Sequence, residues 1–554
     1  MNSNRPKFYI YLPIIFALIL VLGIFVGATF NWNKHDGIIP IDGNYKYNKL
    51  GALLRYVQQE YVDTVDEKKW VDETIVQLLQ NLDPHSTYIT ADELQASNEP
   101  LTGHFGGVGI EFNIVNDTVC VVAVIAGGPS EKIGVKAGDK IISADGKKIS
   151  GVKITNRLVM EQLKGKIDTK VEVKIKRKNS PKLLDFSITR GTIPIYSIDV
   201  SSMLSDDVGY IKISRFAATT YDEYMNAFIK LKKQGMKKLV LDLRGNGGGF
   251  LNTAVELADE FLSSGKEIVY TQGKARPRKD YIATHKGDFE SGELIILIDE
   301  ESASASEILA GAIQDNDRGT IIGRRSFGKG LVQEQSEFSD GSAIRLTIAR
   351  YYTPTGRCIQ KPYANGIEEY YAEESNRYKK GEFENKDSIK VADSLKFKTP
   401  GGKIVYGGGG IIPDIFVPLE VSGITHYINQ AAGEGLITDF AFNYADKERM
   451  RLKRFKTVEQ FNKSFEIKPA LFQDFITYCT NNHIQRNDRE IKKSEHLIKL
   501  QLKALIARNI WNNEGYYAVL QAQDNVLAAT INYIDKQAVQ NVNKKPDISE
   551  IRKP

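Results

Sequence analysis

Apolar positions divide the chain into helical ends and a middle region in which strands predominate. From Tyr45 the apolar residues recur at helical spacing, and this spacing returns in long patterns over 461–478 and 491–527. Residues 103–190 instead show short alternating strands separated by glycine-rich turns, and strands alternate with helices after Pro194. The pattern therefore predicts a multidomain α/β protein.

Three short apolar runs in the α/β region predict buried parallel strands, at 236–243, 293–299 and 319–323. The first is followed by a glycine-rich turn that contains Gly247, Gly248 and Gly249, the second by Ser304 and the third by Lys329. With right-handed crossovers, the carboxyl ends of parallel strands emerge at one edge of the sheet. We therefore expect these three segments to meet at that edge.

The glycine-rich turn at 244–250 resembles a phosphate-binding loop only superficially. Phe250 occupies the sixth position of a dinucleotide fingerprint, and no Gly-Lys-Ser or Gly-Lys-Thr follows. Such a turn still presents backbone amides at the start of a helix, where they suit a developing anion.

Ser304 can be interpreted in two ways. With Glu307 three residues later it forms a capping box, which satisfies amides at a helix start. It can also be a nucleophile, provided that a base lies near it. No histidine lies at a comparable junction of this region, because His285 falls in a polar stretch before a strand. The base that the expected sheet edge offers is Lys329.

A lysine acts as a base at neutral pH only if its pKa falls by about three units from 10.4, which corresponds to roughly 4 kcal/mol. Burial among apolar groups has this effect, and Phe327, Leu331 and Val332 surround Lys329 in the sequence. Gln333 lies four residues further on, and its neutral amide could orient the amine without restoring the charge.

Length, charge and cysteine content narrow the classes of protein. A chain of 554 residues exceeds one hydrophobic core and predicts two to four domains. A net charge of +5 with no long basic block gives no reason to expect nucleic acid as a partner. The three cysteines lie far apart, so neither a metal knuckle nor a disulfide scaffold is indicated.

The N-terminus carries an uncharged apolar run at 9–30 that is long enough to cross a bilayer as a helix. Arg5 and Lys7 precede it, so the positive-inside rule keeps them in the cytoplasm and predicts export of the remainder. We expect a retained anchor in a bacterial-type inner membrane, with the rest of the protein in the periplasm. The alternative is a signal peptide cleaved near Ala28, which would release the protein there.

Residues 103–190 resemble a PDZ domain. The resemblance depends on the glycine-rich first turn, the short helix after Pro129 and the Asp145-Gly146 hairpin turn. It implies that first-turn amides hold the terminal carboxylate of a peptide that adds a strand to the sheet edge. By position this loop comprises Gly107, Val108, Gly109 and Ile110. The alternative is that these glycines only form a tight turn.

Four motifs, in order, resemble those of the carboxy-terminal processing (tail-specific) serine proteases, at 242–249, 302–308, 326–333 and 352–360. The resemblance extends over about 45–418. It implies that Ser304 is the nucleophile, Lys329 the general base and Gln333 the orienting residue, with the amides of Gly248 and Ala305 as the oxyanion hole.

The resemblance also implies a crotonase-like α/β protease core with an inserted PDZ domain, and no metal or cofactor. Its expected substrates are proteins with unstructured C-terminal tails. Gly247 departs from the family pattern, which often has proline there, so the choice between Gly248 and Gly249 stays open.

These observations give a domain organisation in six segments. We expect a membrane anchor, a linker, an N-terminal helical segment, a PDZ domain, a protease core and a helical C-terminal extension, at 1–30, 31–44, 45–100, 101–192, 193–424 and 425–554. A charged, poorly periodic stretch at 368–393 is interpreted as a solvated excursion from the core. The motifs leave the role of the extension open, and a homo-oligomer through the helical termini is one arrangement it would allow.

The sequence also allows three alternative interpretations. Ser326 and Lys329 match the Ser-x-x-Lys of penicillin-binding enzymes, although the companion Ser-Asp-Asn and Lys-Thr-Gly motifs are missing from the sequence. Asp83 and His85 could form an acid–base pair, but Asp before Pro commonly ends a helix. Finally, the chain could be a PDZ scaffold with a catalytically silent core.

Overall fold

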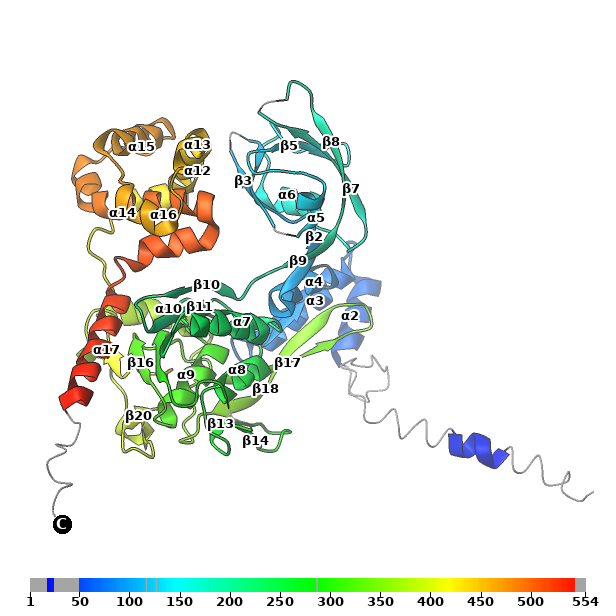
Figure 1. Ribbon diagram of the computed structural model, residues 1–554. Helices are drawn as coiled ribbons and strands as arrows, with labels where there is room; N and C mark the ends of the chain where they lie inside the picture. Colours follow the sequence, from blue (N-terminus) through cyan, green and yellow to red (C-terminus); the bar gives the residue numbers. More distant parts are fainter. Residues whose placement is uncertain are drawn as a thin grey trace, which may run out of the picture. The chain divides into compact units, whose positions relative to one another are not determined.

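A computed structural model describes residues 17–23, 49–115, 117–125, 127–178, 180–284 and 287–543 (Figure 1). The chain falls into two compact units, one formed by residues up to Ser97 with Gln333–Ile348, the other by Asn98–Val332 with the chain from Ala349 onward. Of the anchor predicted at 9–30, the structure describes 17–23, which are helical; the rest of the anchor and the linker lie outside the described residues. Within the described ranges, every helix is too short or too polar to span a bilayer.

The first unit combines helices with a small antiparallel pairing of strands. Its elements are α2 (Lys49–Glu60), α3 (Glu67–Gln80), β1 (Thr87–Ile89), the start of α4 (Ala91–Thr102), most of β17 (Leu331–Glu337) and the first part of β18 (Ala343–Tyr352), with β1 paired to β18. The Asp83 carboxylate accepts the amides of His85 and Ser86 at 2.8 and 2.9 Å and the Thr347 hydroxyl at 3.1 Å. Asp83 therefore organises the turn after α3, which favours the helix stop over an acid–base pair.

The expected PDZ domain is a small antiparallel sheet with two helices. Its elements are β2 (His104–Gly107), β3 (Ile110–Ile114), β4 (Val119–Val124), α5 (Pro129–Lys132), β5 (Lys140–Ala144), β6 (Lys147–Lys148), α6 (Asn156–Leu163), β7 (Lys170–Lys176), β8 (Leu184–Thr189) and β9 (Gly191–Pro194). The sheet order is β3-β4-β5-β7-β8, with β6 on β5. In β7, Val171, Val173 and Ile175 are buried while the residues between them are exposed, the alternation of a sheet with one face on a core. Separately, β2 pairs with β9 and joins the two ends of the domain.

The expected protease core is built on a six-stranded sheet. Its elements are β10 (Ile198–Met203), β11 (Val208–Ile213), α7 (Thr220–Lys233), β12 (Lys238–Asp242), α8 (Leu251–Asp259), β15 (Glu293–Ile298), α9 (Ala305–Asp315), β16 (Thr320–Gly323) and β21 (Ile415–Phe416). The order is β10-β11-β12-β15-β16-β21, and all neighbours from β11 to β21 are parallel. The three predicted strands are therefore adjacent, and their carboxyl ends share one edge as expected.

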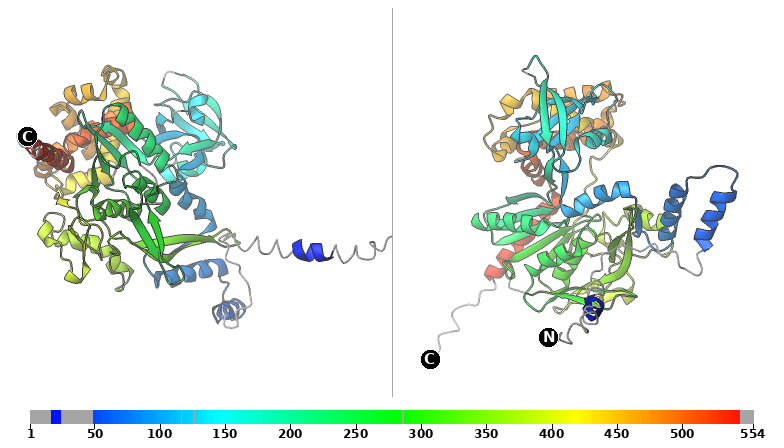
Figure 2. Two further views of the ribbon diagram at one scale, coloured as in Figure 1. Left: turned by 60° about the horizontal axis from the view of Figure 1, so that its bottom comes forward. Right: turned by 90° about the vertical axis from the view of Figure 1, so that its right-hand side faces the viewer.

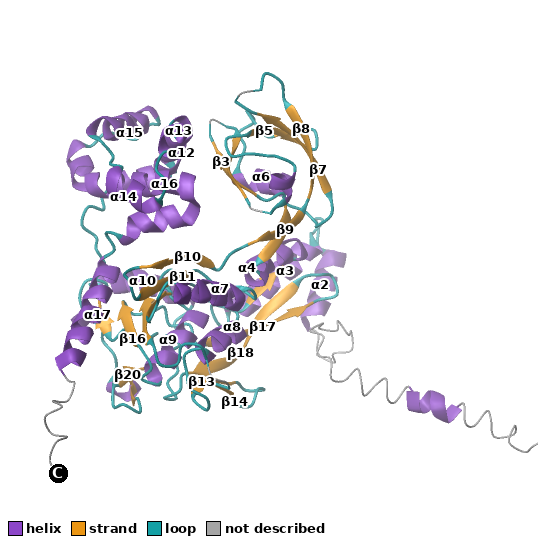
Figure 3. Cartoon of the chain, in the orientation of Figure 1, coloured by secondary structure: helices purple, strands orange, loops and turns teal. Residues whose placement is uncertain are grey.

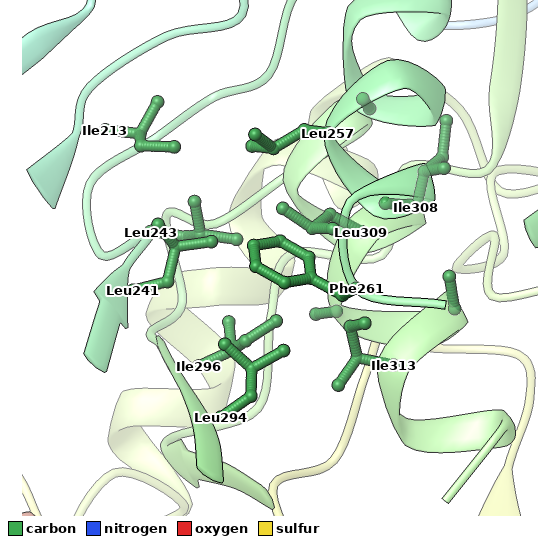
Figure 4. Close-up of a cluster of buried hydrophobic side chains, with 14 of the residues drawn as sticks. Ile213, Leu241, Leu243, Leu257, Phe261, Leu294, Ile296, Ile308, Leu309 and Ile313 are labelled. Atoms are coloured by element: carbon green, nitrogen blue, oxygen red, sulfur yellow. The ribbon is translucent and has the colours of Figure 1, made fainter. Parts of the chain in front are cut away.

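Both faces of this sheet are buried. Successive residues of a strand point to opposite faces, so each strand contributes side chains to both. On one face Leu239 and Leu241 pack with residues of α7, α8 and α9, in the cluster around Phe261 (Figure 4). On the other face Val240 packs with residues of α17 (Asn525–Asn543). Two buried faces explain why the strands appear in the sequence as continuous apolar runs rather than as an alternation.

The remaining core elements are β13 (Glu267–Gln272) and β14 (Lys279–Ile282), which form a hairpin, and β19 (Lys396–Lys398) with β20 (Ile404–Tyr406). The end of β18 pairs with β13. The stretch at 368–393, expected to be a solvated excursion, is largely exposed, and it contains most of the helix α10 (Ile367–Lys379) and a short 3-10 turn at Lys386–Ser388, with a second turn at Asp393–Leu395. Its buried face carries Tyr370 and Arg377, and Arg377 pairs with Glu382 at 2.8 Å. A face buried through ion pairs gives no hydrophobic periodicity, so the pattern did not indicate this helix.

The C-terminal extension is helical, as the colouring by secondary structure shows (Figure 3). Its helices are α11 (His426–Gly433), α12 (Leu436–Lys447), α13 (Arg449–Leu452), α14 (Val458–Ser464), α15 (Pro469–Asn481), α16 (Asp488–Gln521) and α17. The pattern over 461–478 comprises two helices, because the chain leaves helical geometry before Pro469.

The extension divides at a break inside α16. Trp511 and Asn512 have non-helical backbone angles there, with φ of −123° and 52°. The helices before the break share a core that includes Phe461, Phe475 and Leu502, and Val519, after the break, also belongs to this cluster. After it the chain returns to the protease sheet, where α17 lies beside the core strands (Figure 2). The last part of the extension is thus physically part of the core.

Candidate active site

Ser304 lies at a sharp turn between β15 and α9. Its backbone has φ 55° and ψ −113°, an unfavourable conformation for a residue with a Cβ. In α/β-hydrolases, strained strand-to-helix turns of this kind expose the nucleophile. The flanking serines are buried and donate to backbone carbonyls, Ser302 to Leu243 and Ser306 to Asn246, each at 2.9 Å. Ser304 alone of the three is partly exposed.

The Glu307 carboxylate joins the Ser304 turn to the Lys329 segment. Its Oε2 accepts the backbone amides of Ser304 at 2.9 Å and Lys329 at 2.8 Å. Its Oε1 accepts the amide of Gly328 at 2.7 Å and the hydroxyl of Ser326 at 2.5 Å. The Ser304–Glu307 contact is the glutamate half of the predicted capping box, but the same carboxylate also positions the second chain segment.

Tyr351 makes a matching bridge on the carbonyl side. Its hydroxyl lies 3.1 Å from the carbonyl oxygen of Ser304 and donates to the carbonyl of Lys329. The side chain is almost fully buried in β18. The amides of Ser304 and Lys329 thus share one carboxylate oxygen, and their carbonyls share one hydroxyl. We call these two contacts the double bridge; they bring the nucleophile candidate and the base candidate together.

Burial raises the pKa of the Glu307 carboxyl from its ordinary value of 4.5 to about 7. Hydrogen bonds from Ser326, Lys329, Ser304 and Gly328 stabilise the ionised form and limit the rise. The side chain is 0% exposed, so desolvation of the charge is complete.

Gly248 and Ala305, the predicted oxyanion residues, lie against each other. A Cβ on Gly248 would approach the Cβ of Ser304 to 2.8 Å and the nitrogen of Ala305 to 2.9 Å, so only glycine fits there. A Cβ on Gly249 would instead meet the carbonyl oxygen of Phe216 at 2.0 Å. This placement favours Gly248 in the choice that the sequence left open.

The two amides differ in their bonding. Ala305 is the first residue of α9, so its amide has no acceptor within the helix and lies at the positive end of the helix dipole. The Gly248 amide donates to Oδ1 of Asn246 at 2.8 Å. In this state the Asn246 side chain therefore occupies the Gly248 donor, and an oxyanion would have to share or displace it.

Gln333, the predicted orienting residue, lies in β17 and belongs to the first unit. Its side-chain amide donates to the carbonyl of His85 in that unit. Its role beside Ser304 and Lys329 stays a prediction.

Ser326 is the alternative nucleophile of the Ser-x-x-Lys reading. It is 0% exposed, donates to Glu307 and accepts the amide of Ile411 at 2.7 Å. A buried hydroxyl with both functions satisfied is a structural group, and the penicillin-binding interpretation is not supported.

The PDZ loop connects β2 and β3. The carbonyls of Val108 and Gly109 accept the amides of Ser130 and Ile125, each at 3.0 Å, which fixes the loop against the domain. Gly109 has φ 77°, a conformation that favours glycine. The loop and β3 line a groove opposite Met160 and Leu163 of α6. This groove is the place where an added peptide strand would lie.

Three residues of the site were missed in the sequence or were given too small a role. Glu307 was seen only as a cap, and neither Tyr351 nor Arg357 was singled out. Arg357 is 0% exposed and pairs with Asp315 at the end of α9 at 2.7 Å, which ties the 352–360 motif to the nucleophile helix. A charged residue within a turn motif was the available signal. Among the described residues, no cluster of His, Cys, Asp or Glu could hold a metal, and His285 lies outside them.

Because the pKa of Glu307 is raised in the folded state, the free energy of unfolding should depend on pH. Between pH 4.5 and about 7 the folded state keeps a proton that the unfolded state releases, so this contribution is complete below pH 4.5 and is lost as the pH rises through 7. At about 1.4 kcal/mol per pKa unit, the term amounts to about 3 kcal/mol. Urea unfolding at a series of pH values should show this decrease in the wild type and not in Glu307→Gln. Glu256→Gln, on the exposed side of α8, should follow the wild type; a Glu307→Gln curve parallel to the wild type would contradict the assignment.

Family models match three parts of the chain. Peptidase family S41 matches residues 207–371, a PDZ domain matches 106–188, and a family of unknown function (DUF8443) matches 427–512. The last match ends at Asn512, the break in α16.

Curated relatives show the same likeness in sequence. The carboxy-terminal-processing protease of Bartonella bacilliformis is 38% identical over 317 residues, which are 56% of this chain and 72% of that protein. The carboxy-terminal processing protease CtpA of Bacillus subtilis is 33% identical over 320 residues, 58% of this chain and 68% of that protein. A solved photosystem II D1 C-terminal processing protease is 27% identical, with a TM-score of 0.36 over 68% of this chain and 88% of that chain. The sequence matches cover most of their relatives, and the chain belongs to the carboxy-terminal processing proteases of peptidase family S41, with a PDZ domain.

Proposed function

We propose that this serine peptidase uses Ser304 as nucleophile and Lys329 as general base, on a crotonase-like α/β core, to cleave extracytoplasmic proteins near their C-termini. The observation that carries the proposal is the double bridge, which holds the backbones of Ser304 and Lys329 together through Glu307 and Tyr351. The strained, partly exposed backbone of Ser304 supports it, since a merely structural cap needs neither strain nor access.

The reaction would proceed through an acyl-enzyme. The neutral amine of Lys329 takes the Ser304 proton as Oγ attacks the scissile carbonyl, and the resulting ammonium protonates the departing amine. Lys329 then deprotonates the water that hydrolyses the ester. The Ala305 amide, joined by Gly248, would stabilise the oxyanion of both tetrahedral intermediates. Gln333 would orient the Lys329 amine.

The PDZ domain would select the substrates. In the proposed mode an unstructured tail adds a strand to β3, and amides of the loop formed by Gly107, Val108, Gly109 and Ile110 hold its terminal carboxylate. The groove beside α6 supports this mode through its apolar lining, which includes Val122, Met160 and Leu163.

For the membrane, we propose a single-pass anchor at 1–30 that leaves the protease in the periplasm of a bacterial cell. The apolar run and the preceding Arg5 and Lys7 support it. Fractionation of cells that express the full chain should recover it with membranes, and removal of 1–30 should abolish export. Recovery of the full chain as a soluble cytoplasmic protein would refute the anchor.

The proposed dyad is tested by substitution at both positions. Ser304→Ala and Lys329→Ala should each lower kcat/KM on a protein with an unstructured tail by roughly a thousandfold or more, because nucleophile and base act as one unit. Ser263→Ala, an exposed serine of the same core, is the control and should cleave normally. Continued cleavage by Ser304→Ala would overturn the nucleophile, and continued cleavage by Lys329→Ala would overturn the dyad. Tail binding by the wild type without cleavage would contradict the proposed reaction.

Tail recognition is tested with a charge placed in the PDZ groove. Met160→Glu puts a carboxylate beside the bound tail and should lower kcat/KM by about tenfold for a free C-terminus and much less for an amidated one. Leu158→Glu is a matched control, since Leu158 lies on the same helix and both side chains are 43% exposed. Equal losses of kcat/KM for free and amidated tails would show that the groove does not recognise the terminal carboxylate.

A further inference from the structure

We infer that Asp524, in the C-terminal extension, is a positioning residue that holds the oxyanion loop 244–249 through Arg244. This inference goes beyond the proposed function and rests on it, because the loop matters only if Gly248 serves the Ser304 reaction. Arg244 is the second residue after β12, which ends at Asp242.

Arg244 is held between two carboxylates. On one side Asp242, which is 0% exposed, accepts Nε at 2.9 Å and Nη2 at 2.6 Å. On the other side Asp524 accepts Nη1 at 3.1 Å and Nη2 at 2.7 Å, a bidentate contact that fixes the plane of the guanidinium. Burial disfavours the charge of Asp242, yet the cations of Arg244 and Lys212 outweigh it and lower the pKa of that carboxyl well below its usual range. The Arg244 side chain thus has little freedom to move.

Further hydrogen bonds hold the loop between Arg244 and the nucleophile Ser304. Asn246, two residues after Arg244, donates to the carbonyl of Ile213 at 2.9 Å and accepts the Gly248 amide at 2.8 Å. The Asn246 carbonyl accepts the amide of Ala303 at 3.0 Å. Gly248 is four positions after Arg244 and lies directly against Ser304. A displacement of Arg244 would therefore shift the loop backbone as far as Gly248.

Asp524 also begins α17. Its Oδ1 accepts the amides of Val526 at 2.9 Å and Leu527 at 3.1 Å, so it is the N-cap of that helix. Val526 and Leu527 are buried against the sheet face that includes Val240 of β12. One carboxylate therefore fixes both the start of α17 and the start of the oxyanion loop, and docking of the extension supports the active site.

The two roles of Asp524 can be separated by substitution. Asparagine also caps helices well, so Asp524→Asn keeps the start of α17 and removes the charge that faces Arg244. Asp524→Glu keeps the charge. Asp535→Asn is the matched control, because Asp535 is exposed on the same helix.

The readouts use the full chain, a fluorogenic peptide with an unstructured tail and a peptide boronate that forms a tetrahedral adduct with a catalytic serine. Asp524→Asn should lower kcat and boronate affinity each by about tenfold while KM stays within about twofold, because a shifted oxyanion loop weakens only the tetrahedral state. Its Tm should stay within about 2 °C of the wild type. Amide hydrogen exchange should rise in peptides that cover 244–249. Asp524→Glu should recover most of the activity.

The inference is overturned if Asp524→Asn matches Asp535→Asn in kcat and in exchange, or if kcat and KM change together with a matching loss of Tm. Should Asp524→Asn fail to fold, Asp524→Ser supplies a cap oxygen without charge, and normal kcat in that variant overturns the inference. Failure of the proposed function is seen separately, as cleavage that persists in Ser304→Ala. The exchange comparison does not depend on that result.

Discussion

The carboxylate of Glu307 is the group on which the arrangement of the site depends. Four donors from two chain segments converge on its two oxygens. A buried carboxylate is costly unless each lone pair is used, so it tolerates few arrangements of its partners. The Glu307 carboxylate therefore fixes the two segments relative to each other, because its charge is satisfied only when the Ser304 turn and the Lys329 segment are both correctly placed.

The core has several other buried charges, and they lie where segments distant in sequence meet. Arg357 joins the 352–360 motif to α9, and Arg377 joins α10 to the segment before Lys329 through the carbonyls of Arg325 and Ser326. Removal of one partner from such a pair leaves an unpaired buried charge, which is more costly than loss of a surface ion pair. The core therefore uses its apolar clusters for stability and its buried ions to fix the order of its loops.

Much of the fold could be predicted from the sequence because its signals are local. Continuous apolar runs indicated β12, β15 and β16, and the parallel arrangement with one shared edge followed from the crossover rule. The family and its PDZ domain were recognised from four short motifs. The long-range polar contacts could not be predicted in this way. Glu307 and Lys329 are 22 positions apart, and no periodicity reports such a pair.

Two features of the fold were not predicted, because neither has a local signal in the sequence. The α10 helix buries Arg377 rather than an apolar stripe, so the sequence showed no helical periodicity there. The helical extension looked like one appended domain, because the residues at the break in α16 give no sign that the chain returns to the sheet. Of the site residues, Ser304 was recognisable from its place between a strand and a helix, whereas the Asn246 contact that occupies the Gly248 amide required coordinates.

The position of α17 along the chain has a consequence for biosynthesis. One face of the protease sheet is covered by a helix that the ribosome makes some 280 residues after the loop residue Arg244, which pairs with that helix's cap. While the preceding helices are translated, Val240 and its neighbours on that face have no cover. Sequential folding from the N-terminus cannot complete this core. A chain that stops at Asn512 therefore carries every catalytic motif but lacks the helix that packs on this face of the sheet.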